Sequence, residues 1–131
     1  MALAREYAAA LQCPRLHLMA GLLAPSVDHA VAWANYVANL RWAAQQAAQQ
    51  VVAVLVEPLN ARDAPGYLLN RQQRAHDLVA EVAAPNVLVL FDLCHCQISE
   101  GDVATSCAST CPPGMSAICR WPVCPSATSP T

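Results

Sequence analysis

Two acidic residues in this sequence stand at positions where α/β proteins place their chemistry. Glu57 ends the apolar run VVAVLVE at residues 51–57, and Asp92 ends the run NVLVLFD at residues 86–92. An unbroken Val/Leu run is typical of a parallel strand whose two faces are covered by helices. Pro58 keeps Glu57 extended, and parallel strands bring their carboxyl ends, the usual place of active sites, to one edge of a sheet. The sequence therefore predicts that Glu57 and Asp92 lie close together.

Such a pair of carboxylates predicts a metal site. Carboxylate oxygens are hard ligands that suit divalent Mg²⁺ or Mn²⁺, and two of them at one sheet edge can share one cation. The sequence leaves a plainer interpretation open, in which each acid only ends its strand and faces water.

The surrounding segments supply the elements that would hold this pair in place. Turn residues and apolar spacing predict a helix at 2–12, a strand at 15–21, a helix from an N-cap at Ser26 to about residue 50, a strand at 51–57, a helix at 71–82 capped by Asn70, and a strand at 86–92. Alternating helices and strands with short connections are typical of right-handed βαβ units. The predicted fold is therefore α/β, with three parallel strands and intervening helices.

The composition changes after Asp102. Residues 103–131 contain four cysteines, five prolines, no acidic residue and one basic residue, Arg120. They show no helical or strand periodicity. We therefore expect an ordered domain at residues 1–102 and an irregular tail at 103–131 that is disordered or out of frame.

Charge and hydropathy exclude some classes of partner. The 131 residues carry a net charge of -2, which offers no basic face for nucleic acid and no polybasic patch for a membrane. The apolar stretches are shorter than the ~20 residues of a membrane span, and the start lacks the pattern of a signal peptide. We expect a cytoplasmic protein.

Four motifs together resemble one enzyme family. They are LHLMAG at 16–21, ANLRWAA at 38–44, VEPLNARDAPGYLLN at 56–70 and FDLCHCQISEGD at 91–102. Across residues 2–102 they resemble the hydroxypyruvate isomerase family of xylose-isomerase-like TIM barrels. The resemblance implies a partial TIM (β/α)8 barrel holding the family's strands four to six. It also implies interconversion of hydroxypyruvate and tartronate semialdehyde through an enediolate; 2-oxo-tetronate isomerases share these motifs and remain an alternative.

The resemblance also implies roles for the acids and for one histidine. Glu57 matches the family's acid/base and metal-binding glutamate, Asp92 matches a metal ligand, and His95 matches the position that contacts a substrate oxygen. The metal implied is Mg²⁺ or Mn²⁺, which polarises the carbonyl of a small hydroxy-keto acid. The alternative for His95 is a histidine of a surface loop.

Two further residues are candidates for substrate binding. Arg62 follows Glu57 in the same loop, where its guanidinium can meet the substrate carboxylate; the alternative is a salt bridge with the adjacent Asp63. His17 lies within the first predicted strand, where it either contacts substrate or is a satisfied polar group of the inner wall of the barrel.

The resemblance further implies that this chain is a fragment. The family's strand-seven ligand and its second catalytic glutamate have no counterpart here, so we expect the chain as written to be inactive or nearly so. Read in a shifted frame from Ser106 onward, the tail can spell RHVGHLQMAGVPERHEPD, which resembles what the family carries next. We therefore hypothesise a frameshift between about Val103 and Ser106, which the sequence of the source DNA tests.

Two noncatalytic hypotheses remain open. In one, the chain is a zinc-binding or interaction fragment that uses Cys94, His95, Cys96, Cys107, Cys111, Cys119 and Cys124; their irregular spacing is unlike the paired cysteines of structural zinc sites. In the other, the chain associates with itself or another barrel piece, because open sheet edges expose backbone groups that can pair.

Overall fold

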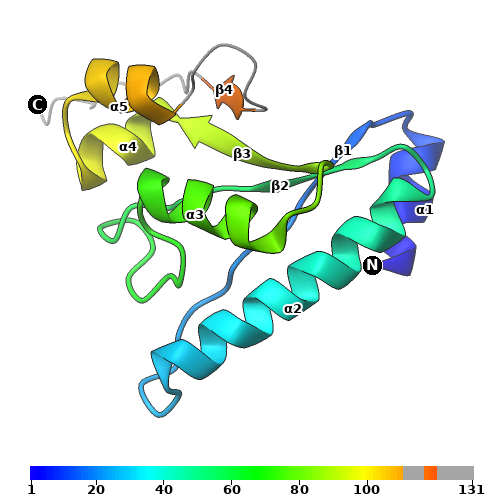
Figure 1. Ribbon diagram of the computed structural model, residues 1–131, viewed down its shortest axis with the longest axis horizontal. Coiled ribbons are helices and arrows are strands. Elements are labelled where there is room, and N and C mark those ends of the chain that lie inside the picture. Colours follow the sequence, from blue (N-terminus) through cyan, green and yellow to red (C-terminus); the bar gives the residue numbers. More distant parts are fainter. Residues whose placement is uncertain (111–116, 121–131) are drawn as a thin grey trace, which may run out of the picture.

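The computed structural model describes residues 1–110 and 117–120, and the side chains of residues 1–108 (Figure 1). In chain order the elements are α1 (Ala2–Ala10), β1 (Arg15–His17), α2 (His29–Ala48), β2 (Ala53–Val56), α3 (Gln72–Val82), β3 (Val87–Asp92), α4 (Leu93–Ser99), α5 (Val103–Thr110) and β4 (Ala117–Arg120). The strands form a parallel sheet in the order β1-β2-β3-β4. The predicted parallel α/β architecture is therefore confirmed, with each predicted strand present but shorter than expected.

One face of the sheet is packed against helices. Val54 and Val56 of β2 point into a core that also contains Leu40 of α2 and Leu78 of α3, and each of these four side chains is 0% exposed. Helices α2 and α3 lie side by side on this face (Figure 1). The expectation that helices cover both faces is wrong for β2, because both crossover helices pack on the same side.

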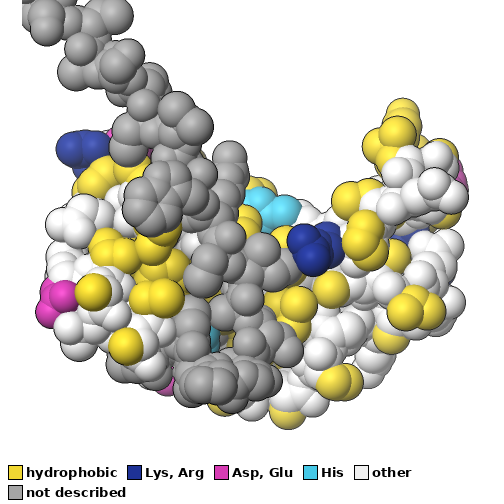
Figure 2. Space-filling view, turned by 90° about the horizontal axis from the view of Figure 1, so that it is seen from above, with side chains coloured by type: hydrophobic (Ala, Val, Ile, Leu, Met, Phe, Trp, Pro, Cys, Tyr) yellow, Lys and Arg dark blue, Asp and Glu magenta, His cyan; other side chains and the backbone are white. Residues whose placement is uncertain are grey.

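The opposite face carries the polar strand ends. Side chains alternate along a strand, so Glu57 lies on the side of Leu55, and Asp92 on the side of Leu90, away from Val54 and its neighbours. His17 shares this face, since its partner in the β1–β2 register is Leu55. Figure 2 shows a hollowed surface with hydrophobic side chains on its walls and a histidine within it. The sheet thus carries its acids and His17 on the face opposite the α2–α3 core.

Two helix starts differ from the prediction. Helix α2 begins after Asp28 rather than Ser26, because Asp28 Oδ1 accepts hydrogen bonds from the backbone N–H groups of Ala30 and Val31. At the start of α3 the Gln72 N–H donates to the Glu100 carboxylate over 2.6 Å. A side chain 28 residues away therefore caps α3 in place of Asn70.

The segment after Asp92 is more regular than expected. Helix α4 starts directly on Asp92, helix α5 follows, and β4 pairs in parallel with β3. Pairing at a sheet edge uses backbone N–H and C=O groups, so β4 forms without a periodic side-chain pattern. The rest of the predicted irregular tail, residues 111–116 and 121–131, lies outside the described residues.

Candidate metal and substrate site

The structure brings Glu57, Asp92 and His95 together at the carboxyl ends of β2 and β3. One ligand atom from each residue lies within 4.8 Å of the other two. Glu57 is 5% exposed and Asp92 is 3% exposed, whereas His95 is half-buried. Within the described part of the chain, this is the one group of three or more potential metal ligands at such spacing.

Glu57 enters this group from the end of β2. His17, at the end of the neighbouring strand β1, places its Nε2 atom 3.6 Å from Glu57 Oε2. The Tyr67 hydroxyl is a further neighbour: burial raises its pKa, and the nearby Glu57 charge raises it further. The parallel register therefore gathers Glu57 and Asp92 as the sequence predicted, and it also places His17 beside Glu57.

Asp92 is also the N-cap residue of helix α4. Its Oδ1 atom accepts hydrogen bonds from the backbone N–H groups of Cys94 (2.9 Å) and His95 (3.0 Å), so the carboxylate caps helix α4. Among the described residues, none donates a hydrogen bond to Oδ2. The two hydrogen bonds fix the Asp92 carboxylate at the start of α4.

Asn60 and Asp63 join the site through His95, and the sequence reasoning missed their role. Asn60 is 0% exposed, and its backbone N–H and side-chain Nδ2 lie 3.3 and 2.7 Å from His95 Nδ1. Asp63 is bound to the same amide, and this hydrogen bond is the largest cause that holds the pKa of Asp63 below its ordinary value. The sequence signal that could have indicated this turn was an Asn followed three residues later by an Asp, directly after a strand.

Arg62 is not part of this group. Its side chain is 71% exposed and its Nε atom lies 3.5 Å from Asp63 Oδ1. It lines a separate pocket of about 240 Å³ with Asn70 and Arg71. The structure therefore shows the salt bridge within the loop, and contact of Arg62 with a substrate carboxylate stays a prediction.

The cysteines expected in the zinc hypothesis are not assembled into a site in the described residues. Cys94 and Cys96 lie on α4 and Cys107 lies on α5. Cys96 is 1% exposed, and burial raises the pKa of its thiol. Cys111, Cys124 and the side chain of Cys119 lie outside the described part, and no group of potential metal ligands within it includes a cysteine.

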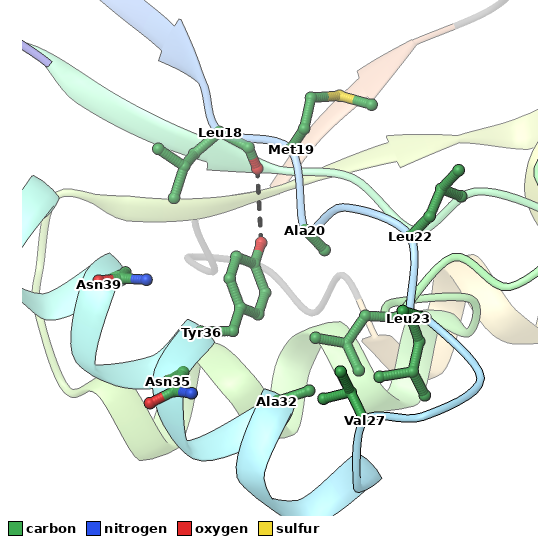
Figure 3. Close-up of a pocket in the computed structure, with 12 residues that line it drawn as sticks. Leu18, Met19, Ala20, Leu22, Leu23, Val27, Ala32, Asn35, Tyr36 and Asn39 are labelled. Atoms are coloured by element: carbon green, nitrogen blue, oxygen red, sulfur yellow. Dashed lines mark hydrogen bonds between the residues drawn. The ribbon is translucent and has the colours of Figure 1, made fainter.

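An apolar groove lies apart from these residues, beside the loop after β1 (Figure 3). It measures about 380 Å³ and is lined mostly by aliphatic side chains, with Asn35 and Asn39 on the α2 side. The Tyr36 hydroxyl donates a hydrogen bond to the Leu18 carbonyl within it. None of the predicted site residues lines this groove.

The donor set at the sheet edge fits a divalent cation. Two buried carboxylates repel each other unless a positive charge lies between them. Oxygen ligands of this kind favour Mg²⁺ or Mn²⁺. Glu57 and Asp92 would hold such an ion.

Comparison with known proteins identifies the family. The profile of the xylose isomerase-like TIM barrel family matches residues 1–116. This chain belongs to that family. The predicted fold, a partial TIM barrel, is thereby confirmed.

Individual relatives agree with this assignment to the xylose isomerase-like TIM barrels. A 2-oxo-tetronate isomerase from Cupriavidus necator is 52% identical over 77% of this chain and 39% of its own length. A hydroxypyruvate isomerase from Escherichia coli is 29% identical over 81% of this chain and 41% of its own length. A crystal structure described as AP endonuclease, family 2, from Brucella melitensis matches with a TM-score of 0.79 and 40% identity, over 82% of this chain and 42% of that one. The chain thus spans about two-fifths of the relatives it matches.

Proposed function

We propose that this chain carries part of the active site of a metal-assisted isomerase acting on a small hydroxy-keto acid. The observation that supports the proposal most directly is the group formed by Glu57, Asp92 and His95 at the ends of neighbouring parallel strands. Carboxyl ends of such strands are where this barrel architecture places its active sites.

In this proposal the protein residues move protons and hold the substrate. A divalent ion, when bound, polarises the substrate carbonyl and stabilises negative charge on oxygen. With hydroxypyruvate, the Glu57 carboxylate takes a proton from C3 to give the enediolate and returns it at C2, while a second proton passes from O3 to O2. Asp92 holds the ion with Glu57, and His95 contacts a substrate oxygen. His17, 3.6 Å from Glu57, orients that carboxylate.

Hydroxypyruvate and 2-oxo-tetronate are the two candidate substrates. The resemblance of the motifs points to the hydroxypyruvate isomerase family. The 52% identity to the 2-oxo-tetronate isomerase, compared with 29% to the hydroxypyruvate isomerase of E. coli, favours the second candidate. Both are small 2-oxo acids and both require the same proton transfer between adjacent carbons.

The described part of the chain contains no helix that is both long and apolar enough to cross a membrane. We expect the enzyme in the cytoplasm, with a small hydroxy-keto acid as its partner. Association with itself or with another barrel piece through the sheet edges stays a separate hypothesis.

Deuterium exchange tests the proposal, because it detects proton abstraction without requiring complete turnover. The purified chain is incubated with Mg²⁺ or Mn²⁺ and each substrate in D₂O, and loss of the C3 proton signal is followed by NMR. Because the chain lacks the second catalytic glutamate of the family, we expect exchange far slower than enzymatic turnover but still faster than in buffer, and Glu57→Gln reduces it to the buffer rate. The matched control is Glu6→Gln, which removes an exposed carboxylate on α1 and retains the exchange. Equal exchange in wild type and Glu57→Gln overturns the proposal.

A further inference from the structure

The contacts of His95 Nδ1 with Asn60 bear on which ring nitrogen carries the proton. We propose that Asn60 is a positioning residue that fixes His95 as the tautomer with its proton on Nε2, so that the ring donates a hydrogen bond to substrate and does not bind the metal. The part of this inference in which His95 donates to a substrate rests on the proposed function. The tautomer assignment is argued from contacts within the chain alone.

The first step of the argument concerns His95 Nδ1. The backbone N–H of Asn60 lies 3.3 Å from this atom, and Asn60 Nδ2 lies 2.7 Å from it. A backbone amide can only donate, so Nδ1 must be the acceptor. A neutral imidazole has one acceptor nitrogen and one N–H. The proton of neutral His95 is therefore on Nε2.

The second step concerns the orientation of the Asn60 amide. Asn60 Oδ1 accepts from the Asp63 backbone N–H over 2.9 Å, and Nδ2 donates to Asp63 Oδ2 over 2.8 Å. Turning the amide over would place Oδ1 against the Asp63 carboxylate and against His95 Nδ1. Because Asn60 is 0% exposed, water cannot compensate for those repulsive contacts. Asp63 therefore locks the amide with its N–H groups toward His95.

The third step concerns what remains for Nε2. The His95 backbone is tied to Asp92 Oδ1 in the first turn of α4, and Nδ1 is occupied by Asn60. A metal ion on Nε2 would require loss of the Nε2 proton while Nδ1 still accepts two donors, which leaves an imidazolate. Retaining the proton keeps the ring neutral and makes Nε2–H a donor. The metal ligands of this group are then the carboxylates of Glu57 and Asp92.

NMR of the ¹⁵N-histidine-labelled chain tests this assignment. The ¹⁵N shifts and long-range couplings of an imidazole distinguish its two tautomers, and the spectrum is recorded at about pH 8.5, above the ordinary histidine range. The His95 signals are identified by their loss in His95→Gln. We expect a pure Nε2–H pattern that persists when Mg²⁺ is added. In Asn60→Asp, a carboxylate oxygen takes the place of the amide at the shorter contact to Nδ1. Its negative charge outweighs the longer contact from the backbone N–H at 3.3 Å, and the His95 pattern changes to Nδ1–H.

Two controls separate positioning from a general effect on structure. Asn70→Asp makes the same change at an exposed position of the same loop, and it leaves the His95 pattern unchanged. Asp63→Asn keeps Asn60 but removes the charge that orients its amide. It adds a minor Nδ1–H population, while the backbone N–H groups of Asn60 and Asp63 continue to favour the wild-type arrangement. If Asn60→Asp unfolds, its four histidines share one averaged pattern, and the Asp63→Asn result decides in its place.

Three results would overturn the inference: an Nδ1–H pattern in the wild-type chain, loss of the Nε2 proton on addition of Mg²⁺, or an unchanged His95 pattern in folded Asn60→Asp and in Asp63→Asn. These results are independent of deuterium exchange. A chain that shows the expected tautomer but no Glu57-dependent exchange contradicts the proposed function alone.

Discussion

The end of helix α2 offers a prediction about stability. Val51 has φ = 58°, a left-handed conformation that is a genuine outlier for a β-branched residue. The Val52 N–H donates to the Ala47 carbonyl and the Val51 N–H to the Ala48 carbonyl, which is the hydrogen-bond pattern of a Schellman motif. Glycine is the usual residue at the left-handed position of this motif, and replacing Val51 with glycine should stabilise the fold.

The size of the effect follows from three terms. The left-handed conformation costs an L-residue about 1–2 kcal/mol. Glycine loses more chain entropy on folding, which costs about 0.5–1 kcal/mol. Val51 is 90% exposed, so removing its side chain sacrifices almost no buried surface. Val51→Gly should therefore raise the free energy of unfolding by roughly 0.5–1 kcal/mol, and Tm by roughly 2–4 °C.

Urea denaturation and a thermal melt followed by circular dichroism measure this change. Val51→Ala is the matched control, because it removes the branching but keeps the Cβ atom that makes the left-handed conformation unfavourable. We expect the alanine variant to gain less than half as much as the glycine variant. A Val51→Gly chain that is no more stable than wild type, or equal gains in both variants, would refute the reasoning.

Three further changes have outcomes that follow from single contacts. Asn86→Ala removes hydrogen bonds from Nδ2 to the carbonyls of Ala44 and Val52, at 2.9 and 3.3 Å, and should lower the unfolding free energy by about 1–2 kcal/mol in urea titration. Tyr67→Phe removes the hydroxyl that accepts a hydrogen bond from the Ala20 backbone N–H over 2.8 Å. It should lower the unfolding free energy by about 1 kcal/mol in the same measurement. Burial lowers the pKa of His76, so its imidazole binds a proton more readily in the unfolded chain than in the folded one. Its contribution to stability is fully present above the unfolded pKa of about 6.5 and is lost as pH falls below it; denaturation at pH 7 and pH 5 should show this loss in wild type and a smaller loss in His76→Gln.

The helix ends and caps were only partly predictable from sequence. The left-handed residues that follow the helices, Gln12, Val51 and Ala83, are not glycines. The predicted helix ends at residues 12, about 50 and 82 nevertheless lie within two residues of the observed ends at Ala10, Ala48 and Val82. The cap of α3 comes from Glu100, which lies 28 positions along the chain from Gln72. Such a partner is set by the packing of α3 against the segment after α4, and local sequence does not contain it.

The strand ends were predictable because their determinants are local. A run of apolar residues that stops at Glu57, with Pro58 next to it, fixes where β2 ends and which face its last side chain takes. The apolar run that stops at Asp92 likewise indicates where β3 ends and which face its last side chain takes. Parallel order then requires the two acids to share one edge of the sheet, and the structure places them there together with His95.

The sequence by itself therefore determined the parallel α/β fold, the family and the pair of acids at the sheet edge. Only the tertiary structure decided how the loops act on that pair: it placed Asn60 against His95, 35 positions along the chain, and left Arg62 beside Asp63 and outside the group. The physical reason is that alternation along a strand is a property of neighbouring residues, whereas the meeting of two loops depends on the packing of every element between them.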